Sequence, residues 1–276
     1  METRYLADQI RYQRMDTEEL RKSYLLENLF NPGSVDLVYS DSDRAIVGSA
    51  VPTENDLLLQ GGKELASDFF AQRREAGIIN IGNKGTIAVD GKQYVMEKLD
   101  GLYIGRGVKE VVFSSENKDE PAYFYILSYP AHKAYPTVQA KISDAEAVKL
   151  GSQAESNERT IYKYIHPAGI KSCQLVMGFT ILAEGSVWNT MPAHTHERRT
   201  EVYVYFDLDK DAVLFHLMGK PEETRHMVMK NRQVALSPSW SIHAAAGTKN
   251  YSFIWGMGGE NQDFGDMDHI TMDDLK

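Results

Sequence analysis

Two histidines and a glutamate in the second half of the chain have a spacing typical of a metal site. His194 and His196 are two residues apart, so on a β-strand both imidazoles leave the same face. Glu201 opens the next apolar run after a polar turn at residues 197–200, and a hairpin would return its carboxylate beside the pair. His243, on a later predicted strand, supplies a third imidazole. Such a donor set suits a borderline divalent ion, Zn²⁺, Fe²⁺, Mn²⁺ or Ni²⁺, with coordination positions left for water or substrate.

A His-x-His pair alone is weak evidence, because two histidines also occur together on a solvated strand face. Glu201 and His243, each in a strand context, favour the metal interpretation. The other histidines of the second half have no comparable partners, and we expect structural or surface roles for them: His166, His216, His226 and His269.

Composition limits the class of protein. The 276 residues are enough for two compact units or one large β-rich unit. Thirty Lys and Arg against 39 Asp and Glu give a net charge of -9, which argues against a nucleic-acid partner. The single cysteine, Cys173, excludes an intramolecular disulfide and a Cys-rich metal site. The charged N-terminus and the short apolar stretches, at most residues 122–129, predict a soluble, cytoplasmic protein without a membrane partner.

The elements that must position these side chains are mostly short strands, and the fold class predicted is all-β. Two segments read as helix: one begins at a capping box in residues 16–19, and the other covers residues 63–76 with Gly77 as its stop. Asp90-Gly91 between two apolar runs predicts a two-residue hairpin. Many short strands separated by turn residues indicate a sandwich or barrel. A polar stretch at residues 143–157 is the expected domain boundary.

The motif His-x-His-x4-Glu, followed about forty residues later by Pro-x4-His, resembles the paired motifs of the cupin superfamily. More narrowly, the chain resembles the 5-keto-4-deoxyuronate isomerase family over its whole length. The segments that carry this resemblance are Gly178-Phe179-Thr180, Gly185-Ser186-Val187-Trp188-Asn189-Thr190-Met191-Pro192, His194-Thr195-His196, Arg198-Arg199, Tyr203-Val204-Tyr205-Phe206-Asp207 and Phe253-Ile254-Trp255-Gly256-Met257-Gly258-Gly259-Glu260-Asn261.

The resemblance implies two jelly-roll (cupin) barrels with a few short helices. Residues 1–150 would form a barrel without a metal site, and residues 151–276 a barrel that binds one Zn²⁺ per chain. Its ligands would be His194, His196, Glu201 and His243. The resemblance also implies a homohexamer, and a reaction that interconverts 5-dehydro-4-deoxy-D-glucuronate and 3-deoxy-D-glycero-2,5-hexodiulosonate in the breakdown of pectin-type polyuronides.

The residues leave the acid–base group and the substrate contacts open. Tyr203 and Tyr205 alternate with Glu201, so they should point into the same interior, where packing is the commoner role of an aromatic ring. Tyr203 and Glu260 are the candidate catalytic residues. The substrate carboxylate requires a cation, and arginine offers bidentate geometry. The candidates, each of which is also readable as a solvated surface charge, are Arg198, Arg199, Arg159, Lys163 and Lys171.

Two other functions fit the same four ligands: an Fe²⁺-dependent cupin dioxygenase and a non-catalytic carbohydrate-binding cupin. Oxygen consumption would identify the first, and binding of the uronate without its interconversion would identify the second. The sequence does not distinguish proton transfer from hydride transfer.

Overall fold

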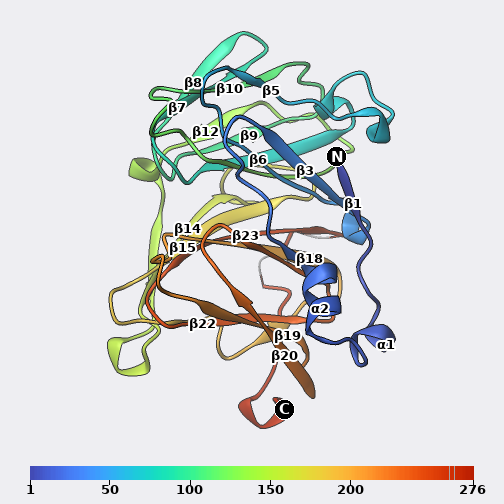
Figure 1. Ribbon diagram of the computed structural model, residues 1–276, viewed down its shortest axis with the longest axis vertical. Coiled ribbons are helices and arrows are strands. Elements are labelled where there is room, and N and C mark those ends of the chain that lie inside the picture. The colour runs from blue at the N-terminus through green and yellow to red at the C-terminus, as the bar shows by residue number, and fades with distance from the viewer. Residues whose placement is uncertain (261, 264) are drawn as a thin grey trace. The chain divides into compact units, whose positions relative to one another are not determined.

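The computed structural model describes residues 1–260, 262–263 and 265–276, and most of its regular structure is β-strand, which confirms the all-β class (Figure 1). The chain divides into two compact units. The first contains residues 1–4, 28–145 and 164–176, and the second contains residues 5–27, 146–163 and 177–276. The division is therefore not a single cut near residue 150, because two segments cross over. No helix in the described part of the chain combines the length and the apolar character that crossing a bilayer would need.

The first unit contains a seven-stranded and a four-stranded sheet. In the order of pairing, the larger sheet is β1 (Glu2–Arg4), β3 (Val35–Ser40), β4 (Ile46–Ala50), β11 (Phe124–Pro130), β6 (Arg74–Asn80), β9 (Gly101–Ile104) and β12 (Val138–Ala140). The smaller is β5 (Leu57–Leu58), β10 (Val111–Ser115), β7 (Gly85–Val89) and β8 (Lys92–Met96). The strand pairings described in this unit are antiparallel, except that β1 and β3 are parallel.

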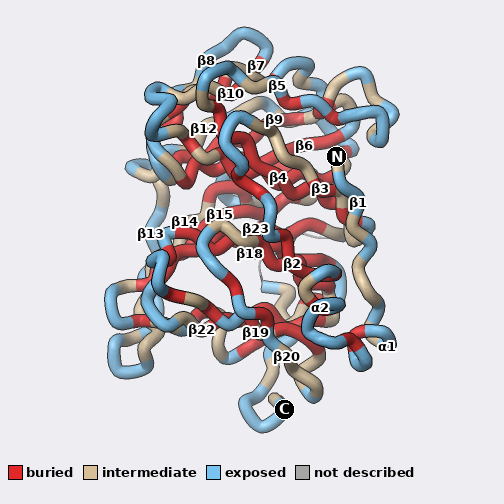
Figure 2. The backbone as a smooth tube through the Cα atoms, viewed as in Figure 1, coloured by how far each residue is buried: buried red, intermediate tan, exposed pale blue. Residues whose placement is uncertain are grey.

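An apolar core fills the space between these two sheets. Alternate residues of β11, Phe124 and Ile126, and alternate residues of β10, Val111 and Phe113, enter one buried cluster. The rings of Phe113 and Phe124 lie 5.3 Å apart. In Figure 2 the buried segments lie mostly in the strands and the exposed ones mostly in the turns. Buried and half-buried residues alternate along β7 and along the start of β10, as expected for strands with one face on the core.

The second unit repeats this arrangement of sheets. Its larger sheet is β13 (Ala147–Leu150), β14 (Arg159–Ile165), β15 (Val176–Leu182), β23 (Ser252–Gly259), β18 (Arg199–Phe206), β21 (Val234–Ser237) and β2 (Leu25–Leu26). Its smaller sheet is β16 (Trp188–Asn189), β22 (Ile242–Gly247), β19 (Leu214–Lys220) and β20 (Glu223–Met229). A two-stranded sheet joins β17 (His194–Thr195) to β24 (Asp268–His269).

The helices are few and short. α2 (Thr17–Tyr24) begins at the predicted capping box, in which Asp16 accepts from the Glu19 N–H at 2.8 Å. It ends at Tyr24, because the chain continues directly into β2. The remaining helical elements are α1 (Gln9–Tyr12) and the 3-10 turns Ser42–Arg44, Lys63–Leu65, Phe70–Gln72, Ile142–Asp144, Gln153–Glu155 and Met272–Asp274.

The helix predicted over residues 63–76 is wrong. Only two 3-10 turns form there, and Ala66 takes a left-handed conformation with φ of 45° that interrupts any helix. β6 starts at Arg74 and buries all seven of its residues, so Gly77 lies inside a strand and is not a helix stop. Tertiary pairing with β11 and β9 overrides the helical pattern of the sequence.

The predicted Asp90-Gly91 hairpin is confirmed. Both residues have positive φ, 47° and 83°, as a type I′ turn requires, and they connect β7 to β8 in register.

Candidate metal centre

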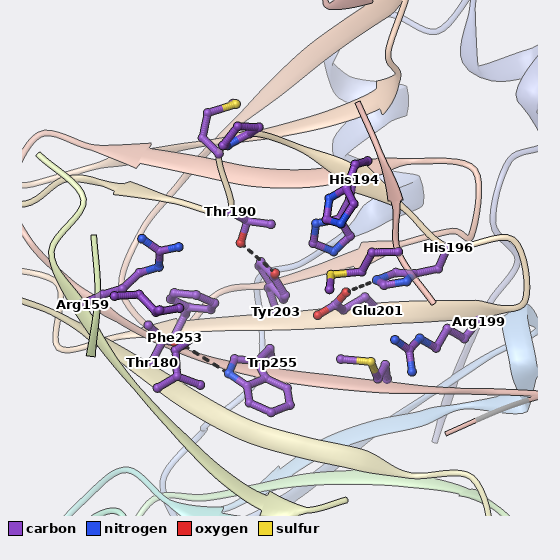
Figure 3. Close-up of a pocket in the computed structure, with 17 residues that line it drawn as sticks. Arg159, Thr180, Thr190, His194, His196, Arg199, Glu201, Tyr203, Phe253 and Trp255 are labelled. Atoms are coloured by element: carbon purple, nitrogen blue, oxygen red, sulfur yellow. Dashed lines mark hydrogen bonds and ion pairs between the residues drawn. The ribbon is translucent and has the colours of Figure 1, made fainter. Parts of the chain in front are cut away.

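The four side chains singled out in the sequence converge in the second unit. His194 lies on β17, His196 follows that strand, Glu201 lies on β18 and His243 on β22. One ligand atom from each lies within 4.8 Å of all the others. His196, Glu201 and His243 are buried and His194 is half-buried. Figure 3 shows His194, His196 and Glu201 close together at one end of a pocket.

The backbone brings these residues together from both sheets of the unit. Glu201 sits on a strand flanked by β21 and β23, opposite Ser237 and Met257. His243 belongs to the smaller sheet, opposite Met218 of β19. The expected hairpin between the His-x-His strand and the glutamate strand does not form, since β17 pairs with β24 instead of β18.

The ring nitrogens of the cluster face inward in one consistent way. Glu201 Oε2 lies 3.1 Å from His196 Nε2 and 2.8 Å from His243 Nε2. His243 Nε2 is 2.9 Å from His194 Nε2. The Nδ1 atoms of His196 and His243 point instead to main-chain oxygens, at 3.3 Å from Asp266 O and 3.4 Å from Ser241 O. Protons placed on those Nδ1 atoms leave the Nε2 atoms as lone-pair donors.

The electrostatics fit a bound cation. Burial by itself would raise the pKa of Glu201, but the adjacent His243 and His196 lower it well below the ordinary value, so the side chain is a carboxylate. Burial, reinforced by His243, lowers the pKa of His194 to about 3, so this imidazole is neutral. Acceptor atoms this close repel one another unless a proton or a metal ion lies between them. Bonds of about 2.1 Å to one ion at right angles separate ligand atoms by about 3 Å. Three contacts of the cluster, at 2.8–3.1 Å, have this length, and all four ligand atoms lie within 4.8 Å of one another. The residues therefore fit a divalent metal.

A cavity of about 420 Å³ lies beside the cluster. Its walls are mainly apolar and aromatic, with polar groups gathered at the cluster. The lining residues are Leu150, Arg159, Ile161, Thr180, Thr190, Met191, Pro192, His194, His196, Arg199, Glu201, Tyr203, Phe253, Trp255, Met257, Met267 and His269. An apolar pocket with a few convergent polar groups is the usual form of a small-molecule site.

Tyr203 is the one candidate catalytic residue that the structure places in the cavity. Its ring lies 5.5 Å from that of His243, and its hydroxyl is 3.2 Å from Thr190 Oγ1. Burial raises the pKa of Tyr203 well above 10, so the phenol keeps its proton. Tyr205 is also buried but lies deeper, and its hydroxyl pairs with His216 Nδ1 at 2.7 Å.

Two of the five candidate cations line the cavity. Arg159 is half-buried, and burial lowers its pKa. Its Nη1 donates to Asn157 O at 2.9 Å. Arg199 is only 1% exposed and forms an ion pair of 2.6 Å with Asp266. In Figure 3 Arg159 lies on one side of Tyr203, and Glu201 with His196 lies on the other.

The other candidates lie elsewhere. Arg198 and Glu260 form an ion pair of 3.6 Å with side chains 66% and 74% exposed, and neither is among the described residues of the cavity wall. Lys163 is not part of that wall either, and Lys171 is exposed and belongs to the first unit. The segment Gly258-Gly259-Glu260 thus does not bring a carboxylate to the site.

Sequence reasoning missed several residues of the site. Asp266, which contacts His196 and Arg199, belongs to none of the motifs in the sequence. His269, predicted as a structural or surface residue, is exposed but lines the cavity, with its ring 6.3 Å from that of His194. No spacing rule could have found them, since each depends on how the C-terminal segment folds back.

The two units of paired, mainly antiparallel sheets have a cupin-type fold, with a buried three-histidine, one-glutamate cluster in the second unit. Solved structures support this fold. An IolB-like protein from Salmonella typhimurium aligns with a TM-score of 0.71 at 11% identity, covering 90% of this chain and 96% of that one. Oxalate decarboxylase from B. subtilis aligns with a TM-score of 0.56 at 10% identity, covering 86% and 77%. Tomato vicilin gives 0.55 at 9%, covering 79% and 76%.

Sequence comparison then identifies the family. Residues 26–272 match the KduI/IolB family. The 4-deoxy-L-threo-5-hexosulose-uronate ketol-isomerase of Caldicellulosiruptor bescii is 53% identical over the full length of both chains. The enzyme of that name from Bacillus subtilis is 51% identical, also over both full lengths. The chain belongs to the KduI/IolB family.

Proposed function

We propose that this protein is a metal-dependent ketol-isomerase that interconverts 5-dehydro-4-deoxy-D-glucuronate and 3-deoxy-D-glycero-2,5-hexodiulosonate in polyuronide breakdown. The observation that carries the proposal is the ligand cluster at the end of a mainly apolar cavity that is also lined by Arg159. The full-length similarity to enzymes named as ketol-isomerases of this uronate supports the choice of reaction.

The metal we propose is one Zn²⁺ per chain, held by His194, His196, Glu201 and His243. Three imidazoles and a carboxylate form a donor set that zinc accepts, with coordination positions left for substrate oxygens. When bound, the ion supplies Lewis-acid stabilisation of the negative charge that develops on a carbonyl oxygen during isomerisation. Glu201 is the one negatively charged ligand of the set. The site with its divalent ion would therefore keep a net positive charge and accept an anionic substrate.

Tyr203 is the residue we propose for hydrogen bonding to the reacting end of the substrate. Its raised pKa keeps the hydroxyl protonated, so it can donate to an oxygen on which charge is building up. Thr190 at 3.2 Å is a second hydroxyl that fixes the direction of the phenol. The apolar side chains of Phe253, Trp255 and Met257 keep water away from this region and strengthen such bonds.

Arg159 is the residue we propose for the substrate carboxylate. It faces the cavity without a carboxylate partner among the described residues, whereas Asp266 already neutralises Arg199. A uronate bound with its carboxylate at Arg159 places its carbonyl end toward the cluster, past Tyr203 (Figure 3). This arrangement uses arginine for the bidentate contact that it makes best.

The first unit carries no comparable cluster in its described residues, and its interior is the apolar core around Phe113 and Phe124. We propose that this barrel is structural and that the second unit performs the chemistry. The family resemblance also leads us to propose a homohexamer, which sedimentation equilibrium would test.

The test is a carbon-13 NMR assay of the uronate before and after chelation of the protein, with Zn²⁺ added back. We expect interconversion to stop on chelation and to return with metal. Glu201→Gln should abolish activity, whereas Glu260→Gln, a matched change on the surface, should not. Interconversion that survives chelation, or an equal effect of both substitutions, would refute the proposal. Oxygen uptake by an iron-loaded sample would indicate the dioxygenase, and binding without turnover the non-catalytic protein.

A further inference from the structure

The C-terminal segment around residues 266–270 forms part of the wall of the metal-ligand cavity. β24 pairs with β17, so His269 stands opposite His194 and Asp268 opposite Thr195. The Ile270 N–H donates to Ala193 O at 3.0 Å. Met267 and His269 contribute to the lining of the cavity. This segment therefore contacts the part of the chain that carries two of the four cluster residues.

Within this segment, Asp266 faces the outer nitrogen of His196. His196 Nδ1 lies 3.3 Å from the main-chain oxygen of Asp266 and 3.3 Å from its Oδ1. The other ring nitrogen, Nε2, faces Glu201 in the centre of the cluster at 3.1 Å. Two negatively polarised oxygens at Nδ1 stabilise the tautomer that has its proton there, and that tautomer presents the Nε2 lone pair to the centre.

Arg199 holds the Asp266 carboxylate in this place. The guanidinium is 1% exposed, and its Nη2 lies 2.6 Å from Asp266 Oδ1. The other ion pairs that the structure describes give Arg199 no second carboxylate. A buried guanidinium without a counter-charge is strongly destabilising, so the fold favours keeping Asp266 beside Arg199. Asp266 Oδ1 thus lies between Arg199 and His196 and contacts both.

We propose that Asp266 and Arg199 are positioning residues of the metal centre, which fix the orientation and tautomer of His196 from outside the ligand set. The inference rests on the proposed metal site but assigns residues beyond it. A ligand histidine whose second nitrogen meets a carboxylate or carbonyl is a better donor and is already oriented before the ion arrives. Arg199 then acts through Asp266 and does not bind the substrate carboxylate, which leaves that role to Arg159.

The contribution of Asp266 is measurable as metal affinity. Asp266→Asn keeps the size of the side chain and its carbonyl oxygen but removes the charge. We expect the Kd for Zn²⁺, measured by competition with a chromophoric chelator, to rise about 10- to 100-fold, as for other residues that support metal ligands. Asp268→Asn is the matched control, the same change at an exposed position two residues away, and should stay within about twofold of the unmodified protein.

A second readout separates positioning from general damage to the fold. At saturating Zn²⁺ the Asp266→Asn protein should recover most of its kcat with an unchanged KM for the uronate. Arg199→Gln should weaken metal binding as well. The double variant Arg199→Gln/Asp266→Asn should have a Kd for Zn²⁺ no higher than that of the single variant with the larger loss, because both residues act through His196. If Arg199→Gln fails to fold, the double variant can still be measured, because it removes both charges of the ion pair and leaves neither of them unpaired.

The proposal is overturned if Asp266→Asn and Asp268→Asn bind Zn²⁺ equally well, or if the losses in the double variant add. These outcomes are distinct from failure of the proposed function. If the unmodified protein binds no divalent metal, the metal site itself is wrong. If it binds metal and isomerises the uronate while the Asp266 variant behaves normally, only the positioning role is wrong.

Discussion

At the scale of residues, the surroundings of Glu201 and His194 give these two side chains the protonation states that a metal ligand needs. Glu201 is held as a carboxylate by His243 and His196 in spite of its burial. His194 is held neutral by burial. The sequence predicted these ligand residues because a His-x-His pair, a following glutamate and a later histidine form a strong local pattern. It could not predict Asp266, which meets His196 from 70 residues away.

Arg159 gives the first prediction at this scale. Replacing it by Gln removes the charge that we assign to the substrate carboxylate, and charge-assisted hydrogen bonds are worth about 1.5–3 kcal/mol. We therefore expect the KM for the uronate to rise about tenfold or more, with a smaller change in kcat. Steady-state kinetics of Arg159→Gln beside Arg198→Gln, an exposed neighbour of the cluster, will show the difference. Equal KM values for the two variants would remove Arg159 from the binding site.

His216 gives the second prediction, on stability in acid. Burial, with His243 nearby, lowers the pKa of His216 to about 3, whereas an unfolded histidine titrates near 6.5. Between these two pKa values the unfolded state binds a proton that the folded state does not bind. The free energy of unfolding therefore falls as pH falls from about 6.5 toward 3, by about 1.4 kcal/mol per pH unit for this group.

Urea unfolding of the chelated protein at several pH values measures this slope. His216→Gln should reduce the slope by about one proton between pH 6 and 4, while His226→Gln, at an exposed position, should leave it unchanged. If His216→Gln has the acid slope of the unmodified protein, His216 is not held neutral by the fold.

At the scale of elements, local signals predicted turns and caps well, and tertiary contacts decided the rest. The capping box at Asp16 and the Asp90-Gly91 turn each depend on only a few consecutive residues, and both form. The false helix at residues 63–76 had an apolar pattern, but Leu65 and Phe70 pack in the apolar core from separate 3-10 turns, and only the last residues of the stretch enter β6. The sequence predicts a hairpin between the His-x-His strand and the strand of Glu201, but the two-residue strand β17 pairs with β24 near the end of the chain.

Glu75 on β6 provides a prediction at this scale. Its buried carboxylate accepts the Tyr103 hydroxyl at 2.8 Å and the N–H groups of Cys173, Gln174 and Leu175 at 2.7–3.0 Å. Glu75→Gln turns one acceptor oxygen into a donor that faces other donors. We expect a loss of about 3 kcal/mol in the free energy of unfolding, since buried unsatisfied groups cost about 1–3 kcal/mol each.

Chemical denaturation compares this variant with Glu110→Gln, the same change at an exposed position of the first unit, which should alter stability by less than about 0.5 kcal/mol. A Glu75→Gln protein as stable as the Glu110→Gln protein would show that the carboxylate does not hold residues 173–175 to β6.

At the scale of the whole molecule, two units of like architecture differ in what fills them. The first has an apolar core between its sheets, and the second places tyrosines, histidines and a glutamate in the corresponding space. The all-β class followed from the many short strands. The crossing of residues 5–27 and 164–176 between units did not, because it depends on pairings such as that of β2 with β21.

Because all four proposed ligands belong to the second unit, metal should protect that unit selectively. Binding stabilises the folded state by about 2.7 kcal/mol at one hundred times the Kd. Hydrogen exchange with and without Zn²⁺ should show slower exchange in β18, β22 and β24, with no change in β6 and β11. Equal protection of both units would contradict a site confined to the second.

The most direct measurement is anomalous diffraction at the zinc edge from crystals of the Zn²⁺-loaded, active protein. We predict one peak per chain, about 2.0–2.2 Å from the inner nitrogens of His194, His196 and His243 and from a Glu201 oxygen. An active protein without a peak there, or with its metal bound elsewhere, would contradict the assignment of these four residues.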